Sequence, residues 1–360
     1  MLPPLRSLDR LTRHDINFLP VFEIFDGLEA RAPAAKHRLT KPLRGSTRGR
    51  LAFLKIKPMA RAGFLVLAAA VAGAAPASVW GVTANPSEAF LPSFVEIVRG
   101  PAGGTIWQGV IGNGAYPRSR RLSLVYFPPG FSAQRLYPTL YILHGIRGSP
   151  YSIANGLRFA SFADDAIVAG QVRPFLAVMP PAGLTPRFSG EWTGPWERYV
   201  VDNVVAWTDR NLPALRLRRA RAIAGLSAGG YGAVDIGLRH PTLFGTIESW
   251  SGSFFAPHDG SLRHASAQQL DANDPTILAE SEQGLLRRLR TRFFLSCGSN
   301  DRGNLVRSID FARLLDALGV RHRTFFAAGG HDGRFWETQL PAALRYAFPV
   351  VSHGESSPSA

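Results

Sequence analysis

Short apolar runs alternate with amphipathic stretches through most of the chain from about Phe94 onward. Runs that are apolar at successive positions are typical of strands buried on both faces. Stretches with an apolar residue every three or four positions are typical of helices that pack on one side. This alternation predicts an α/β fold with a mainly parallel central sheet and helices on both faces. The predicted strands are residues 122–127, 139–143, 175–179, 220–224, 244–250, 293–297 and 323–327, and the predicted helices are residues 196–211, 228–239, 304–318 and 335–348.

The net charge of +15 is distributed in a way that does not indicate nucleic-acid binding. Residues 1–58 hold 12 Lys and Arg against 5 Asp and Glu, and they contain every lysine of the chain. Residues 62–360 hold 28 against 21, which is a small excess for a segment of this size, and their arginines form no basic stripe. We therefore expect no nucleic-acid partner.

Residues 59–77 have the parts of a secretory signal peptide. Arg61 is followed by an apolar run at residues 63–75. Ala75-Pro76-Ala77 fits the small-residue pattern at which such peptides are cleaved, and Ala72-Gly73-Ala74 is an alternative cleavage site. The run is short and rich in alanine, whereas a membrane span needs about 20 strongly apolar residues. We expect cleavage and export, either to the cell envelope or periplasm or out of the cell. An uncleaved anchor that contacts the membrane is the alternative.

Signal peptides begin close to an initiating methionine, and Met59 directly precedes this segment. Residues 1–58 show no sustained helical or strand period, so they are interpreted as a mis-called start or a disordered extension. The other expected parts are a linker at residues 78–92, the α/β domain at residues 93–350 and a polar, flexible tail at residues 351–360.

A candidate nucleophile lies where a predicted strand meets a predicted helix. Residues 225–229, Gly-Leu-Ser-Ala-Gly, match the pattern G-x-S-x-G, which a chain with 36 glycines can contain by chance. Here a strand runs into the pattern and a helix leaves it, which is the context of a nucleophile elbow. The glycines permit a sharp turn that exposes the Ser227 hydroxyl, and the helix directs its positive end toward it. The alternative is a surface serine in a glycine-rich turn.

A serine hydroxyl needs an adjacent base, and His331 is the best placed histidine after Ser227. Enzymes with this elbow carry their histidine on the loop after the last strand, and the acid lies between serine and histidine in the chain. His331 follows Gly329-Gly330 directly after the last predicted strand. His240 ends a predicted helix and His322 starts a predicted strand, so neither lies on a comparable loop.

Asp301 is the candidate acid of the same site. It follows the predicted strand at residues 293–297, where a carboxylate can orient the imidazole and stabilise its cation. Asp310 and Asp316 lie on the next predicted helix and are interpreted as surface charges. Asp332 is directly next to the histidine, and adjacent side chains diverge, so we expect it to fix the loop.

Acyl transfer also requires two hydrogen-bond donors for the developing oxyanion. One is expected to be the backbone N–H of Ala228, the residue after the nucleophile. The second should come from the loop after an early strand, and the strand at residues 139–143 leads into His144, Gly145 and Ile146. The N–H of Ile146 is the candidate, and His144 is expected to shape the loop without acting as a base.

At these residues the chain resembles the putative esterase (esterase D-like) family of α/β hydrolases, which includes S-formylglutathione hydrolases, feruloyl esterases and antigen 85 mycolyltransferases. The resemblance implies the α/β-hydrolase fold. It also implies that Ser227, Asp301 and His331 form the catalytic triad and that Ala228 and Ile146 are the oxyanion donors. Members often have a tryptophan where this chain has Gly333. The resemblance runs from about Ser119 to Phe348 and rests on residues 125–130, 140–145 and 223–232, on residues 239–241 with 244–245, on Ser251-Gly252, on Cys297-Gly298 with Asp301, and on Gly330-His331-Asp332 with Trp336.

The predicted function is that of a serine carboxylic-ester hydrolase that acts on a small-molecule or lipid ester through a covalent acyl-serine intermediate. One alternative is an acyltransferase of the mycolyltransferase type, which passes the acyl group to a sugar or lipid hydroxyl with the same triad. Another is a non-catalytic module on this fold. No cofactor or metal is expected, because the sequence has no metal cluster, nucleotide loop or flavin motif. Cys297 is the single cysteine and is expected to be a buried small residue.

Overall fold

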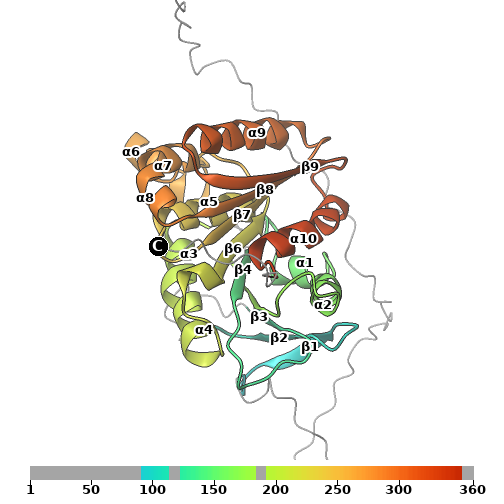
Figure 1. Cartoon of the computed structure of the whole chain (residues 1–360). Coiled ribbons are helices and arrows are strands. Elements are labelled where there is room, and N and C mark those ends of the chain that lie inside the picture. Colours follow the sequence, from blue (N-terminus) through green and yellow to red (C-terminus); the bar gives the residue numbers. More distant parts are fainter. Residues whose placement is uncertain (1–90, 113–121, 184–191, 351–360) are drawn as a thin grey trace, which may run out of the picture. The chain divides into compact units, whose positions relative to one another are not determined.

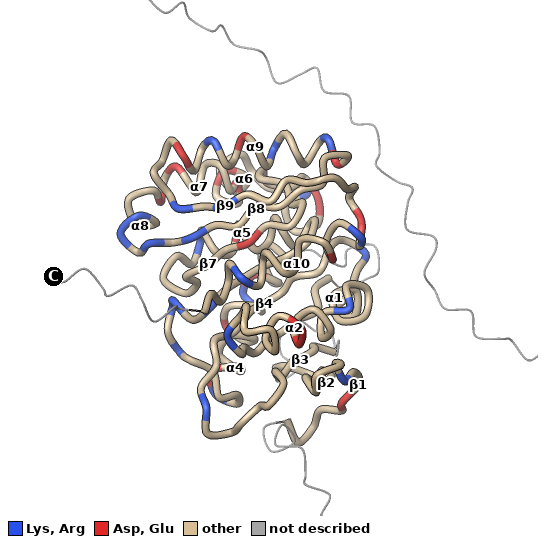
Figure 2. Tube along the Cα trace, turned by 45° about the vertical axis from the view of Figure 1, so that its right-hand side comes forward, with Lys and Arg blue, Asp and Glu red and all other residues tan. Residues whose placement is uncertain are grey.

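The computed structural model describes residues 91–112, 122–183 and 192–350. The predictions for residues 1–58, 59–77 and 351–360 lie outside the described residues. Of the linker expected at residues 78–92, only residues 91 and 92 are described. Within the described ranges, no helix combines the length and the apolar character that a membrane crossing needs. Basic and acidic residues are scattered over the described elements (Figure 2).

The centre of the described part is a nine-stranded sheet (Figure 1). Its strands are β1 (Val95–Arg99), β2 (Thr105–Gly109), β3 (Ser123–Phe127), β4 (Thr139–Leu143), β5 (Leu176–Met179), β6 (Arg221–Leu226), β7 (Thr246–Trp250), β8 (Arg292–Gly298) and β9 (Arg321–Ala327). They lie in the order β1-β2-β3-β5-β4-β6-β7-β8-β9. The first three pairs in this order, β1–β2, β2–β3 and β3–β5, are antiparallel. The remaining five pairs, from β5–β4 to β8–β9, are parallel. The expected mainly parallel sheet is therefore confirmed.

Helices cover both faces of the sheet, because successive strand residues enter two different cores. In β4, Leu140 and Ile142 belong to one core and Tyr141 and Leu143 to the other. The first core is completed by α1 (Pro150–Ala154), α2 (Phe159–Val168) and α10 (Gly333–Ala347). The second is completed by α3 (Pro195–Arg198), the π-helical segment Tyr199–Val205, α4 (Ala206–Asn211), α5 (Ala228–Arg239), α7 (Pro275–Ser281), α8 (Gln283–Arg288) and α9 (Arg302–Ala317). Helix α6 (Ala267–Asp271) has no buried residue.

The predicted elements are present with small shifts at their ends. All seven predicted strands form, and the helix predicted at residues 196–211 is divided into α3, a π-helical middle and α4. Strands β1 and β2 have no counterpart in the prediction. In β1 every residue is at least partly exposed, so it lacks the continuous apolar run by which the buried strands were recognised. The short helices α1, α2 and α6 to α8 were not predicted either.

The parallel strands bring the candidate site residues to one edge of the sheet. Leu143 at the end of β4 is paired with Gly225 of β6, and Gly298 at the end of β8 is paired with Ala327 of β9. The loops that follow the strands of each pair are therefore neighbours. In open α/β sheets, ligands bind at this carboxyl-terminal edge.

Candidate active site

Ser227 forms the turn between β6 and α5. Its backbone lies at φ 55° and ψ −120°, a conformation that residues other than glycine rarely adopt. The backbone N–H of Ser227 donates a hydrogen bond of 2.8 Å to the Trp250 carbonyl of the neighbouring strand, which helps to hold this conformation. Because Ser227 is the single residue of a sharp turn between β6 and α5, its hydroxyl lies at the edge of the sheet.

The two glycines of the motif are required by close backbone approaches. A Cβ at Gly225 would lie 2.1 Å from the carbonyl oxygen of Gly229. A Cβ at Gly229 would lie 2.1 Å from the carbonyl oxygen of Leu143 in β4. Both distances are far below van der Waals contact, and both partners are backbone atoms. At Gly225 the limit is the tight turn of the elbow itself, and at Gly229 it is the packing of the elbow on β4, so neither position has room for a side chain.

His331 lies on the loop between β9 and α10, and its ring reaches Ser227. The Nε2 atom is 2.8 Å from the Ser227 Oγ, which is hydrogen-bond distance. The edge of the ring also contacts Trp336, with 5.1 Å between ring centroids. Trp336 is itself fixed, because its Nε1–H donates to the Ser251 Oγ at 3.2 Å. The imidazole is thus held between the serine and a buried tryptophan.

Asp301 precedes α9 and completes the hydrogen-bonded series. Its Oδ2 atom is 2.6 Å from the Nδ1 of His331, on the opposite side of the ring from Ser227. Burial raises the pKa of Asp301, but hydrogen bonds from His331, Asn304 and Cys297 and the attraction of the imidazole lower it by more. The pKa of this carboxyl therefore lies below its usual value, and Asp301 is ionised at neutral pH.

Two further residues hold the Asp301 carboxylate. The Asn304 side-chain amide donates to Oδ1 at 3.1 Å and to Oδ2 at 3.2 Å. The thiol of Cys297 lies 3.6 Å from Oδ2. Burial and the proximity of Asp301 raise the pKa of Cys297 to about 12, so it remains a protonated thiol that can donate. Cys297 is buried, as expected, but its contact with the acid was not anticipated.

Asn304 was missed as a site residue, although one signal for it was present in the sequence. It stands three positions after Asp301, and residues three apart share one face of a helix. Because Asp301 directly precedes α9, an amide at this spacing can reach back to the carboxylate. Without the fold, however, the same residue is indistinguishable from any polar residue in a first helical turn.

The two expected oxyanion donors lie on loops that follow paired strands. Ala228 begins α5, and Ile146 is three residues beyond the end of β4. A Cβ on Gly145 would lie 3.3 Å from the Ser227 Cβ, so the loop after β4 packs directly on the serine. Both N–H groups therefore belong to backbone segments that adjoin Ser227.

His144 fixes the loop after β4 with both of its ring nitrogens. The N–H of Ala182 donates to Nε2 at 3.2 Å, so Nε2 is unprotonated and Nδ1 carries the proton that is donated to the Gly145 carbonyl at 2.9 Å. The indole N–H of Trp192 also donates to the His144 carbonyl at 2.9 Å. This buried histidine is committed to structural contacts.

The structure does not bring the rejected candidates to the serine. His240 caps α5 and is 2.9 Å from a carboxylate oxygen of Glu197. His322 on β9 has its Nε2 atom 3.8 Å from a carboxylate oxygen of Asp316 on α9. Asp332 caps α10, where its carboxylate accepts from the N–H of Phe335 at 3.0 Å.

A mainly parallel sheet with this serine, histidine and aspartate at the ends of its strands defines an α/β hydrolase. The chain belongs to the putative esterase family, whose family model matches residues 115–347. It is thus an esterase-family member of the α/β-hydrolase type, as the resemblance in the sequence implied.

Two relatives agree with this classification, and a solved structure shares the fold. The chain is 32% identical over 145 residues to an endo-1,4-beta-xylanase/feruloyl esterase of Xylanibacter ruminicola, covering 38% of this chain and 20% of that protein. It is 26% identical over 229 residues to an esterase of Mycobacterium tuberculosis, covering 55% of this chain and 49% of that protein. The chain therefore spans about a fifth and about half of the length of these two relatives. A solved ferulic acid esterase has the same fold, with a TM-score of 0.59 and 23% identity over 68% of this chain and 98% of that one.

Proposed function

We propose that this chain hydrolyses carboxylic esters through a covalent acyl intermediate on Ser227. The observation that carries the proposal is the continuous series of hydrogen bonds from the Ser227 Oγ to His331 at 2.8 Å and from His331 to Asp301 at 2.6 Å. A base within hydrogen-bond distance of a hydroxyl, itself oriented by a carboxylate, is the arrangement that makes serine a nucleophile.

The first half of the proposed reaction forms the acyl-enzyme. The Oγ of Ser227 attacks the ester carbonyl carbon while Nε2 of His331 accepts the hydroxyl proton. The tetrahedral intermediate then expels the alkoxide, which takes that proton from the imidazolium and leaves as the alcohol. Asp301 stays ionised throughout and stabilises the imidazolium. Its lowered pKa is consistent with this role.

The second half releases the acid. Water attacks the acyl carbon as Nε2 of His331 accepts a proton from it, and the second tetrahedral intermediate expels the Ser227 oxygen. The imidazolium returns the proton to that oxygen, and the carboxylic acid departs. In both halves the negative oxygen would be stabilised by the N–H groups of Ala228 and Ile146, with support from the positive end of α5.

The proposed substrate is a small-molecule carboxylic ester. The Xylanibacter relative and the solved structure carry feruloyl or ferulic acid esterase in their names, so methyl ferulate is a reasoned first substrate beside simple acetyl and butyryl aryl esters.

Labelling with a fluorophosphonate tests the nucleophile directly. The native chain should be labelled at one site, and Ser227→Ala should lose the label together with about a thousandfold or more of its kcat. Ser281→Ala, a change at an exposed serine of α7, is the matched control and should keep both. Full labelling of Ser227→Ala would refute the assignment.

Export is a separate proposal that rests on the sequence alone. The basic start, apolar centre and small-residue site of residues 59–77 support a cleaved signal peptide and a place of action in the envelope, the periplasm or outside the cell.

A further inference from the structure

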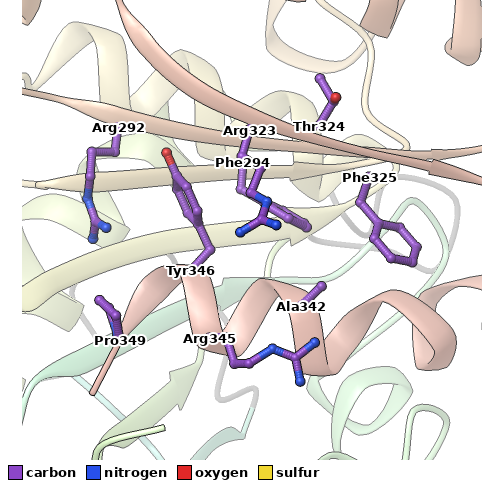
Figure 3. A pocket seen from close by; sticks show the side chains of 9 residues that line it. All are labelled: Arg292, Phe294, Arg323, Thr324, Phe325, Ala342, Arg345, Tyr346 and Pro349. Atoms are coloured by element: carbon purple, nitrogen blue, oxygen red, sulfur yellow. The ribbon is translucent and has the colours of Figure 1, made fainter. Parts of the chain in front are cut away.

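A cavity of about 410 Å³ lies between the sheet and the last helix, and none of the three triad residues lines it. Its walls come from β8, β9 and α10 (Figure 3). Cavities of this size hold small organic molecules in many proteins. The proposed ester hydrolysis does not use this cavity.

Three arginines from three different elements line the cavity. Arg292 comes from β8, Arg323 from β9 and Arg345 from α10 (Figure 3). No acidic side chain is among the residues that line the cavity, and none of the ion pairs formed within the described ranges involves these arginines. Three uncompensated guanidinium groups around one cavity create a positive potential that attracts an anion.

Arg292 is held in place before any ligand arrives. One of its Nη atoms donates to the Thr246 Oγ1 at 2.7 Å and to the Ala347 carbonyl at 3.3 Å. Its guanidinium also lies over the Tyr346 ring, 5.0 Å from the centroid. These contacts fix the plane of the guanidinium, so less rotamer entropy is lost when it binds an anion. Arg345 donates at 2.9 Å to the side-chain oxygen of Gln171, which is not among the residues that line the cavity.

The register of the sheet explains why the arginines and the apolar rings share one face. Arg292 and Phe294 alternate with the residues on the other face of β8, and Phe294 is paired with both Glu248 of β7 and Arg323 of β9. Glu248 is therefore an acidic residue on the same face of the sheet as Phe294 and Arg323. Burial raises its pKa to about 8, so it is mostly uncharged at neutral pH and does not cancel the arginines.

The rest of the lining is mainly apolar and aromatic. Phe294, Phe325 and Tyr346 contribute three aromatic rings to the lining (Figure 3), and Phe325 and Tyr346 are partly exposed whereas Phe294 is buried. A small inorganic anion would leave these rings in contact with water. An organic anion would bury an apolar body against the rings and pair its charged group with guanidinium, which is suited to bidentate contact with a carboxylate.

We propose that this cavity is a binding site for a small carboxylate that carries an aromatic or aliphatic body. Compounds of this class are also the acids that ester hydrolysis releases, and that link to the reaction rests on the proposed function. The binding itself does not depend on catalysis.

Calorimetric titration of the full chain with 4-phenylbutyrate tests the proposal, with 4-phenylbutanol as the uncharged comparison and inorganic phosphate as the compact anion. One site per chain should bind 4-phenylbutyrate, and the other two compounds should bind at least about tenfold more weakly. The double variant Arg323→Gln/Arg345→Gln should raise the Kd for 4-phenylbutyrate about tenfold or more. Arg288→Gln, at an exposed arginine of α8, is the matched control and should leave it unchanged.

Each other outcome overturns the proposal in a distinct way. Equal affinity in the native chain and the double variant would place any binding elsewhere, including at Ser227. If phosphate binds as tightly as 4-phenylbutyrate, the site does not require an apolar body in its ligand. If 4-phenylbutanol binds as tightly, the site does not require a negative charge. Because the titration follows no turnover, an inactive enzyme would refute the proposed hydrolysis and leave this result standing.

Discussion

The side-chain amide of Asn304 donates to both carboxylate oxygens of Asp301, at 3.1 and 3.2 Å. The same nitrogen lies 3.4 Å from the Nδ1 of His331. Asn304 therefore restrains the carboxylate that contacts the imidazole, and its hydrogen bond is one of the causes that lower the pKa of Asp301. It acts on the reaction through Asp301 and is in that sense a positioning residue.

Replacing Asn304 with alanine should lower kcat about tenfold while KM changes little, because an oriented imidazole matters more in the transition state than in substrate binding. Asn304→Asp should be worse, since a second negative charge beside Asp301 raises the pKa of that pair of carboxyls. Steady-state kinetics on aryl esters measure both. Asp310→Ala, at an exposed acid of the same helix, should behave as the native chain. An unaltered kcat in Asn304→Ala would show that the contact has no role in the reaction.

Gly229→Ala should destabilise the chain by several kcal/mol or prevent folding, because its Cβ would lie 2.1 Å from a backbone oxygen of β4. Gly284→Ala is the matched control. It makes the same substitution in α8, where a Cβ would meet no atom within 4 Å, and it should stabilise the fold by about 0.5–1 kcal/mol. Urea denaturation of both variants measures the difference. Equal stabilities would contradict the tight packing of the elbow on β4.

Glu248 should make the fold less stable as pH rises. Burial raises its pKa from 4.5 to about 8, so between these values the folded chain keeps a proton that the unfolded chain has lost. The free energy of unfolding should therefore fall with rising pH across that window, by up to about 1.4 kcal/mol per pH unit from this group. Below pH 4.5 both states are protonated and above pH 8 both are ionised, so the contribution of the group levels off on either side.

Glu248→Gln should remove this part of the pH dependence. Glutamine keeps an acceptor for the Trp250 indole N–H, which donates to Glu248 at 3.1 Å in the native chain. Urea denaturation from pH 5 to 9 measures the slope in both proteins, and Glu280→Gln on the exposed side of α7 serves as control. If native and Glu248→Gln proteins have parallel profiles, Glu248 does not titrate in this range.

Water should outcompete alcohols for the proposed acyl-enzyme. Hydrolase and acyltransferase share the same triad chemistry, and they differ in whether a bound hydroxyl acceptor is held near the acyl carbon. With a simple aryl ester, acid release should equal alcohol release, and trehalose, glycerol or a diacylglycerol at about millimolar concentration should leave that ratio unaltered. If one of these acceptors takes most of the acyl group into a new ester, the chain is an acyltransferase.

The exported protein should begin near Ser78. Arg61, the apolar run at residues 63–75 and Ala75-Pro76-Ala77 have the order of a cleaved signal peptide. N-terminal sequencing of protein recovered from the envelope or the medium identifies the first residue. Recovery of membrane-bound chain that still contains residues 63–75 would favour the anchor, and recovery only from the cytoplasm would exclude export.

Local signals were sufficient to find the parallel part of the sheet and to name Ser227, Asp301 and His331, but not Asn304. Ser227 was identified from a pattern within five residues and the strand and helix on either side of it. Asp301 and His331 were named because each follows a predicted strand, and the structure brings both within hydrogen-bond distance of their neighbours in the series. These inferences needed the context of the elbow, the order of serine, acid and histidine along chains that carry it, and the rule that parallel strands end at one edge of the sheet.

Contacts between distant segments were decided by the tertiary structure. The order of the strands, the pairing of β1 with β2 and the division of the helix at residues 196–211 depend on packing that no local pattern encodes. The same holds for the three arginines of the cavity, which lie up to 53 positions apart in the chain and converge only because β8, β9 and α10 pack together. A residue's apolar spacing, turn propensity and charge act within a few positions, whereas its burial, its pKa and its partners are set by whichever segments the fold places around it.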